Sequence, residues 1–511
     1  MIDATNDISQ FSALLQAFRN RYKCEPEYVV KSPGRINIIG EHIDYSGYPV
    51  LPMAINECIY AACSLKKDSE TITISNIDPQ YEEFEETLSH VIISCNDPCW
   101  KDYFLSGVQA TVGHVFDSEE EEDANATVKL TLRGFNAMIS SELPARAGLA
   151  SSSALVCCGA ACTMVAVGDG NFSTLSKEGL ADLCAISERS VGVFGGSMDH
   201  FICFTARQGA AKYIQFNPIR LEDVTLPPKA RFMVFNCGLE SAKGSENSMF
   251  NKRVTECHLA TKLIANIFRL DWRRMHTIKD VQDAVGDIDE NMFKEIALSA
   301  FTQVSYTVAE IANILQCDES ELKFLFYQRY STSDFINSFI FQWLFVSLLC
   351  RLRFIVMQIS GEQFCLKMRA RHVIEESMRV KQFRSICDQF ANGQLAEDLC
   401  LNQLGKLMDD SHHSCSYFFD CSCKELDFIQ QMFKVHGAIG SRLTGAGWGG
   451  AVIALIDADR AETFQESVVR YIEGSVFRNN KPFFVSPGEC LQIFTLPHNL
   501  NVSYRSSFSS S

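Results

Sequence analysis

Hydrophobic and polar positions first predict the elements of the N-terminal part of the chain. Apolar residues recur at helical spacing over residues 11–22, which predicts an amphipathic helix. Residues 28–30 begin an extended stretch that turns at Pro33-Gly34 and resumes to Gly40, so a hairpin-like strand pair is predicted. Alternation places Ile36 and Ile38 on the core face and leaves Arg35 and Asn37 on the opposite face.

The same reading predicts further strands and helices along the chain. Alternating or short apolar runs predict strands at 71–76, 128–133, 232–235 and 451–456. Helical patterns cover 154–167, 258–268 and 372–383. The segment 117–123, DSEEEED, is expected to be a solvated acidic loop. Strands interspersed with helices predict an α+β fold with a domain boundary near residues 215–230.

Composition narrows the class of protein. The chain has 511 residues, of which 47% are hydrophobic and 21% charged, and these values are typical of a soluble globular protein of two domains. Its net charge of −16 argues against nucleic acid or an anionic membrane as the main partner, because both repel an acidic surface. A small-molecule substrate is therefore favoured.

The N-terminus and the cysteines indicate the compartment. Residues 1–18 have acidic residues where a signal peptide needs basic ones, so a cytoplasmic protein is expected. In that reducing setting the 21 cysteines are interpreted as buried small apolar residues rather than disulfides. The uncharged run at 335–350, FINSFIFQWLFVSLLC, is shorter than the roughly 18 to 20 residues that cross a bilayer, so no membrane span is predicted.

Three separate stretches carry candidate chemistry. In Gly34–Pro52, GRINIIGEHIDYSGYPVLP, charged and polar side chains gather where a strand ends. A single Glu–His pair would be explained by a polar turn with a salt bridge, but this larger set suits a ligand with many hydroxyl groups. In Leu143–Leu155, LPARAGLASSSAL, a glycine turn precedes serines at a predicted helix start. The unpaired backbone N–H groups there could bind phosphate, and the simpler alternative is a serine that caps the helix.

The third stretch is Thr444–Gly450, TGAGWGG, which opens a strand. Its glycines carry an entropic cost that is tolerable where the backbone approaches another group closely, although a plain turn is the simpler reading. No GxxxxGK[ST] sequence occurs, which excludes a Walker-type nucleotide site.

Taken together and in this order, the three stretches resemble the motifs of the GHMP small-molecule kinases, and within them the galactokinase family. GRINIIGEHIDY is the most specific of the three motifs. The continuation IDYSGYPVLPMAI, which begins with Ile43, and the tryptophan in TGAGWGG are more similar to the N-acetylgalactosamine kinase branch. Supporting stretches are SERSVGVFGGSMDH and SHHSCSYFFDCSCKELD.

The resemblance implies a fold and a reaction. It implies a two-domain α+β GHMP kinase fold, with the active site in the cleft between an N-terminal domain (1–220) and a C-terminal domain (221–497). It also implies that ATP, with Mg²⁺, phosphorylates the anomeric hydroxyl of N-acetylgalactosamine. Galactose is the nearest alternative acceptor, and a catalytically weak sugar- and ATP-binding regulatory protein is an alternative from another class. A monomer with no partners beyond sugar and ATP is expected.

The resemblance also assigns residue roles. Asp199 corresponds to the catalytic base and Arg35 to the arginine that orients it. The implied sugar ligands are Arg35, Glu41, His42, Asp44, Asp199 and Phe250. The implied ATP-binding residues are Trp100, Gly148, Leu149, Ser151, Ser152 and Ser153, and the implied Mg²⁺ ligands are Ser152 and Glu188.

Several features depart from the family pattern. Arg146 replaces a usual glycine, Ala150 a usual serine and His200 a usual glutamine, so their effect on catalysis is an open question. Residues 336–363 interrupt the family pattern, and we interpret them as an unspliced intron in a gene model. A tail at 498–511 is expected to be disordered. Histidines and cysteines at 412–423 lack a regular zinc-ligand spacing and are interpreted as packing residues.

Overall fold

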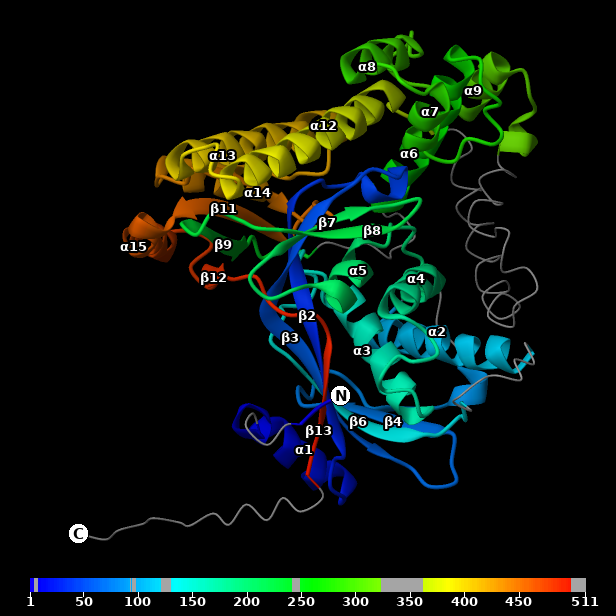
Figure 1. The fold of residues 1–511 in the computed structure, drawn as a ribbon, viewed down its shortest axis with the longest axis vertical. Coiled ribbons are helices and arrows are strands. Elements are labelled where there is room, and N and C mark those ends of the chain that lie inside the picture. The colour runs from blue at the N-terminus through cyan, green and yellow to red at the C-terminus, as the bar shows by residue number, and fades with distance from the viewer. Residues whose placement is uncertain are drawn as a thin grey trace.

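The computed structural model describes residues 1–3, 8–91, 93, 98–120, 130–240, 249–322 and 362–497. The tail at 498–511 and nearly all of the insertion at 336–363 lie outside these ranges. The acidic segment 117–123 was expected to be a loop, but its described part, 117–120, is the end of a helix, and 121–123 lie outside the described residues. Within the described part, a large sheet and a small sheet are joined by helices that cover both, which confirms the α+β expectation (Figure 1).

The large sheet has the strand order β1-β13-β2-β3-β6-β4-β5. Its strands are β1 (Ile2–Asp3), β2 (Tyr28–Ile39), β3 (Leu51–Leu65), β4 (Thr71–Asn76), β5 (Phe84–Thr87), β6 (Phe135–Ser141) and β13 (Gln492–Thr495). Only β1–β13 and β4–β6 pair in parallel. Because β13 pairs with β2, the end of the described chain returns to the N-terminal half, although the sequence-based division assigns residues 492–495 to the second domain.

Two strand predictions were wrong in detail. Residues 28–39 form one continuous strand rather than a hairpin, with register shifts between Pro33 and Arg35. A Cβ on Gly34 would lie 2.4 Å from a methyl carbon of Leu143, so this point is a crowded bulge and not an open turn. Residues 130–133 are not a strand, because the Thr131 N–H donates to a carbonyl near the end of a helix and the ladder begins at Phe135.

The small sheet forms the core of the C-terminal half, with the order β10-β11-β9-β12. Its strands are β9 (Ala230–Asn236), β10 (Gly440–Thr444), β11 (Ala451–Asp457) and β12 (Phe483–Val485). A separate hairpin consists of β7 (Ala211–Gln215) and β8 (Arg220–Val224). The strands predicted at 71–76, 232–235 and 451–456 are confirmed.

Helices fall into two groups in Figure 1. Those beside the large sheet are α1 (Ser12–Tyr22), α2 (Trp100–Glu120), α3 (Ser151–Ala166), α4 (Lys177–Glu188) and α5 (Met198–Thr205). The others are α6 (Met249–Ile267), α7 (Ile278–Val285), α8 (Glu290–Ser299), α9 (Val308–Leu315), α12 (Leu366–Ala391), α13 (Glu397–His413), α14 (Lys424–Val435) and α15 (Ala461–Glu473). Helix α3 is apolar on nearly every side because α2, α4, α5 and the large sheet surround it.

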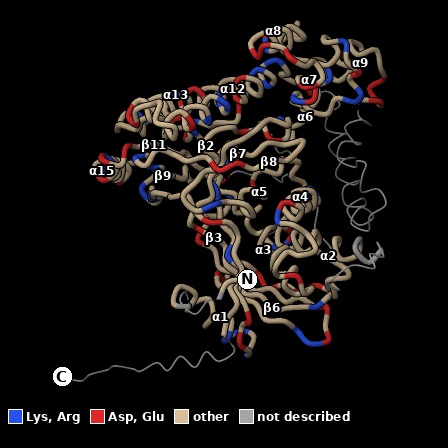
Figure 2. Tube along the Cα trace, viewed as in Figure 1, with Lys and Arg blue, Asp and Glu red and all other residues tan. Residues whose placement is uncertain are grey.

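Short helical turns complete the described chain. They are η1 (Ile8–Phe11), η2 (Asp44–Ser46), η3 (Leu88–His90), η4 (Arg189–Val191), the π-helix η5 (Ser414–Phe419) and η6 (Ala458–Arg460). Lys and Arg are interspersed with Asp and Glu along the described chain (Figure 2). No helix in the described ranges has the length and apolar character to span a bilayer.

Candidate active site

Arg35 and Asp199 meet where the large sheet lies beside α5. Arg35 comes from the middle of β2, and Asp199 lies in the first turn of α5. Arg35 Nε donates to Asp199 Oδ1 at 2.7 Å and Nη2 donates to Oδ2 at 3.1 Å. This paired geometry fixes the carboxylate plane, because the guanidinium is a rigid fork. The structure therefore brings together two residues that are 164 positions apart.

The same arginine reaches the glycine-rich turn before α3. Arg35 Nη1 donates to the Gly148 carbonyl oxygen at 2.6 Å, and the Arg35 backbone N–H donates to the Leu149 carbonyl at 3.1 Å. Leu149 itself is buried. The first and second sequence motifs are thus joined by hydrogen bonds through one residue.

Asp44 is a second carboxylate close to Asp199. It lies within the first motif, at the start of η2. Burial, and then the negative charge of Asp199, raise the pKa of Asp44 to about 6. A Cβ at Gly196 would lie 2.1 Å from Asp44 Oδ2, so only glycine fits beside this carboxylate.

Glu41 connects the first motif to the third. Its Oε1 accepts the Gly445 N–H at 2.7 Å and lies 3.7 Å from Nη1 of Arg442. Burial raises the pKa of Glu41, and the nearby arginines Arg442 and Arg35 oppose that effect. Glu41 is therefore held by protein groups on at least one oxygen.

His42 also makes contacts within the protein, although the resemblance implies a sugar ligand. Nε2 lies 2.9 Å from the Ala446 carbonyl oxygen, and Nδ1 lies 3.0 Å from the Tyr45 hydroxyl. Since a carbonyl only accepts, Nε2 donates its proton to the Ala446 oxygen. The ring also stacks on Phe419 with centroids 4.6 Å apart. Its contact with Ala446 makes His42 a link between the first and third motifs.

Two aromatic residues implied by the resemblance lie in different clusters. Phe250, in α6, is buried with its ring centroid 5.5 Å from His42 and 6.0 Å from Tyr45. Trp100 begins α2 and packs edge-on against Phe84, at 5.3 Å between ring centroids. Phe250 is thus placed beside the first motif, whereas Trp100 packs against β5.

The serines of the second motif occupy the first turn of α3. Ser151 is the first helical residue, and Ala150 precedes it at φ 58° without a side-chain capping bond. The N–H groups of this turn are therefore not capped by a side chain at that position, which suits an anion. Ser151 and Ser152 are partly exposed, whereas Ser153 is buried and lies 3.3 Å from both carboxylate oxygens of Glu188.

The glycines of the third motif are required by close backbone approach. Gly445 has φ +87°, and a Cβ there would lie 2.5 Å from the Gly148 carbonyl oxygen. Gly148, at φ +78°, would in turn place a Cβ 2.6 Å from the Thr444 carbonyl oxygen. The second and third motifs therefore touch backbone to backbone, and side chains would separate them.

Two departures from the family pattern have clear positions. Arg146, at φ 53°, extends to Glu240, with Nη1 2.6 Å from Oε2, and both side chains are more than half exposed. His200 is 1% exposed, and its Nε2 lies 3.3 Å from Oε2 of Glu188. Arg146 is thus paired at the surface, whereas His200 lies inside the protein.

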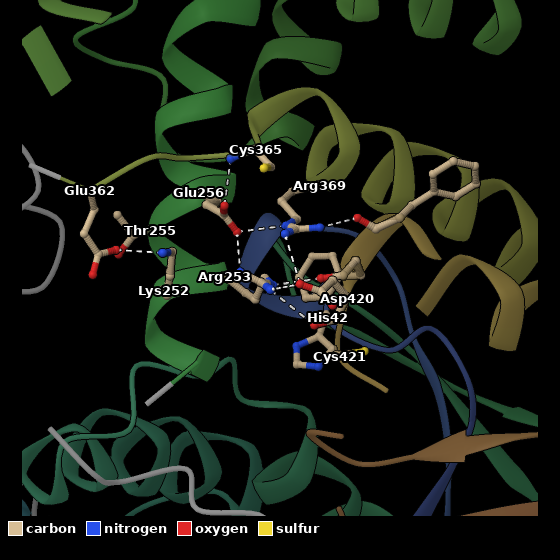
Figure 3. Close-up of polar contacts among 12 residues, drawn as sticks. His42, Lys252, Arg253, Thr255, Glu256, Glu362, Cys365, Arg369, Asp420 and Cys421 are labelled. Atoms are coloured by element: carbon tan, nitrogen blue, oxygen red, sulfur yellow. Dashed lines mark hydrogen bonds and ion pairs between the residues drawn. The ribbon is translucent and has the colours of Figure 1, made fainter. Parts of the chain in front are cut away.

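Beside His42, an ionic cluster that contains the buried Arg253, Glu256 and Arg369 and the exposed Asp420 supports the third motif (Figure 3). Arg253 donates to Glu256 Oε2 at 2.9 Å and to Asp420 Oδ2 at 2.6 Å. Arg369 donates to the same Glu256 oxygen at 2.8 Å. Asp420 in turn accepts the Trp448 indole N–H on its carbonyl at 3.1 Å. The sequence analysis did not identify these residues. Charged side chains at otherwise apolar positions of a helix could have indicated that they are paired inside the protein.

The histidines and cysteines at 412–423 have packing partners. His412 Nε2 lies 3.1 Å from Asp427 Oδ1, and its Nδ1 accepts the Leu443 N–H at 3.1 Å. His413 stacks on Tyr417. Across the residues that the structure describes, no cluster of three or more His, Cys, Asp or Glu side chains could hold a metal ion.

Comparison with protein families gives three matches. The galactokinase galactose-binding signature matches residues 16–65, the GHMP kinase N-terminal domain matches 116–207, and the GHMP kinase C-terminal domain matches 395–473. Each of the three sequence motifs lies within one of these matched ranges.

Whole proteins show the same similarity. The chain is 33% identical over 483 residues to a galactokinase from Dictyostelium discoideum, covering 91% of this chain and 88% of that one. It is 28% identical to a galactokinase from Saccharomyces cerevisiae, covering 87% and 85%. Among solved structures, a galactokinase from Lactococcus lactis in complex with galactose superposes with a TM-score of 0.66 at 22% identity, covering 94% of this chain and 99% of that one.

Proposed function

The chain belongs to the galactokinase family of the GHMP kinases, and on that premise we propose that it transfers the γ-phosphoryl group of ATP to the anomeric (C1) hydroxyl of a galactose-type sugar. It is a sugar kinase. The observation that carries the proposal is the paired Arg35–Asp199 contact, joined to the Gly148 turn by the same guanidinium.

Asp199 is the proposed base. In the transfer, the sugar C1 oxygen bonds to the γ-phosphorus, the bond to the β-phosphate oxygen breaks, and ADP leaves with that electron pair. The proton of the C1 hydroxyl moves to Asp199, which Arg35 holds in a single orientation. Arg35 also places positive charge beside the turn that precedes α3, where charge on the transferring group needs stabilisation.

Sugar binding is proposed to involve Glu41, His42, Asp44 and Phe250. Asp44 is best placed of the carboxylates, since it lies close to Asp199 where the C1 hydroxyl would stand. His42 and Glu41 are engaged with the third motif, so they would shape the sugar site as well as contact it. Phe250 supplies an apolar wall beside His42.

ATP is proposed to lie along the start of α3. Gly148, Leu149, Ser151, Ser152 and Ser153 would surround the phosphates, and Trp100 would stack beside the adenine. The N–H groups of the first helical turn point toward such an anion, and the helix dipole adds to the attraction.

The oxygen donors near α3 fit Mg²⁺. Glu188 is a carboxylate beside the serine hydroxyls, and hard oxygen donors of this kind are what Mg²⁺ prefers. Ser152 and Glu188 are the proposed ligands. When bound, the ion would neutralise charge on the β- and γ-phosphates.

Two sugars compete as the acceptor. Ile43 and Trp448 are the sequence features that favour N-acetylgalactosamine, which is our first candidate. The relatives named galactokinase give galactose at least equal support. ADP release should therefore be measured in parallel with N-acetylgalactosamine, galactose and mevalonate, and the phosphate located on the product. Activity with one of the two sugars at C1 is expected, and activity with mevalonate alone would refute the proposal.

A further inference from the structure

His200 follows Asp199 in α5 and is almost completely buried. It is 1% exposed, and within the described residues neither Nδ1 nor Nε2 makes a hydrogen bond of ordinary geometry. Leaving a buried polar group without a hydrogen bond is unfavourable, so such a ring is retained where its nitrogen has another use.

The ring faces a carboxylate and a hydroxyl. His200 Nε2 lies 3.3 Å from Glu188 Oε2, and Ser153 Oγ lies 3.3 Å from each Glu188 oxygen. Ser153, Glu188 and His200 are all less than 10% exposed. The three donors come from α3, α4 and α5, so one imidazole, one carboxylate and one hydroxyl converge from separate helices.

The spacing of these atoms suits two ligands of one ion. Neighbouring ligands of an octahedral cation at about 2.1 Å are about 3.0 Å apart. The Nε2–Oε2 separation of 3.3 Å is within a few tenths of that value. We propose that His200 Nε2 and Glu188 are two ligands of a single divalent cation, with the Ser153 hydroxyl beside them, so that the site has mixed nitrogen and oxygen ligands.

A nitrogen ligand changes which ions bind well. Imidazole favours transition metals, whereas Mg²⁺ prefers oxygen donors only. The site should therefore prefer Mn²⁺ and Co²⁺ over Mg²⁺ more strongly than a site of oxygen ligands does. The inference rests on the proposed function, because the cation is the one that would accompany the phosphates of ATP.

Pulsed electron paramagnetic resonance of Mn²⁺ tests nitrogen ligation directly. The full-length wild-type protein is mixed with Mn²⁺ and ADP, without sugar, and compared with protein labelled with ¹⁵N-histidine. A nitrogen modulation that changes on labelling is expected, because only a histidine ligand responds to the label. The ADP nitrogens are unlabelled, so they give the same signal in both samples.

Variants identify which histidine is responsible. His200→Gln should abolish the label-dependent modulation and lower the preference for Mn²⁺ over Mg²⁺, measured as a ratio of dissociation constants, by about tenfold. The control is His436→Gln, because His436 follows α14 and bonds to Ser467 of α15, away from α3, α4 and α5. It should keep the modulation.

The inference fails if Mn²⁺ does not bind with ADP, or if it binds without a label-dependent modulation. In that case His200 is only a neighbour of Glu188. The sugar assays separate this failure from failure of the proposed function. Kinase activity without the modulation overturns the cation site alone, whereas the modulation without activity toward any sugar leaves the cation site and overturns the reaction.

Discussion

At the scale of single residues, the site is determined by charged groups that hold one another. The Asp199 side chain is 12% exposed and that of Arg35 3%, so their pair is shielded from solvent. Shielding strengthens the interaction, because the effective dielectric constant falls below that of water. A carboxylate fixed in this way can face one reacting hydroxyl and little else.

Replacing Asp199 with asparagine removes the proposed base while preserving shape. Asp199→Asn should lower kcat by about 10² or more and leave the sugar dissociation constant within a few-fold, since the amide still accepts hydrogen bonds. Steady-state kinetics and calorimetric sugar binding measure the two quantities. Asp459→Asn is the control, because Asp459 pairs with Lys229 at the surface. A fully active Asp199→Asn enzyme would remove the assignment.

At the scale of elements, the turn before α3 and the loop between β10 and β11 form one unit. Gly148 and Gly445 approach each other through backbone atoms, and Glu41 accepts the Gly445 N–H from the first motif. Both glycines have positive φ, which other residues adopt only at a cost. The turn before α3 is therefore positioned by a loop nearly three hundred residues later in the chain.

Substituting Gly445 tests this contact. Gly445→Ala should lower the free energy of unfolding by about 2 kcal/mol more than a control and raise KM for ATP, because its Cβ would lie 2.5 Å from the Gly148 oxygen. Gly209→Ala is a matched control, with φ +82° and no atom within 4 Å of the added Cβ. Chemical denaturation and initial rates supply the measurements. Equal losses in both variants would show that the close approach is unimportant.

At the scale of the whole molecule, buried charges join the two halves. Glu376, in α12, accepts the Gly40 N–H at 2.9 Å and the Arg379 Nε–H at 2.6 Å. Arg442, in β10, donates to the Asn37 carbonyl of β2 at 2.8 Å. Gly40 and Asn37 belong to the first motif, so the C-terminal half holds the sugar motif in place through these bonds.

Glu376→Gln should weaken this junction. Burial would raise the pKa of Glu376, but Arg379 and Arg442 outweigh it and lower the pKa to about 2. Stability from this carboxylate is therefore present above pH 4.5 and is lost as pH falls toward 2. At pH 7 the variant should lose about 3 kcal/mol of unfolding free energy.

The neighbouring Glu375→Gln is the control, because Glu375 pairs with the partly exposed Arg371 and should cost less than about 1 kcal/mol. Denaturant titrations at pH 7 and at pH 3.5 compare the variants. The deficit of Glu376→Gln should be smaller at pH 3.5 than at pH 7. A deficit that does not depend on pH would show that the charge of Glu376 is not what joins the halves.

The order of residues was sufficient to predict most local elements and the set of chemically active side chains. Periodicity is a property of neighbouring residues, so it predicted the buried α3 and the strand β11, and it placed polar side chains at the end of β2. The motif order was sufficient to indicate the family. Periodicity also misled at Pro33-Gly34, because a bulge and a turn contain the same residues.

Which groups meet depends on how distant segments pack together. The pair of Arg35 with Asp199, the backbone contact of Gly148 with Gly445 and the approach of His200 to Glu188 each depend on packing between distant segments. Sequence patterns report which face of an element is buried, but they carry no information on what lies opposite. The positions of catalytic groups therefore follow from how the helices and sheets pack, whereas their identities follow from the sequence.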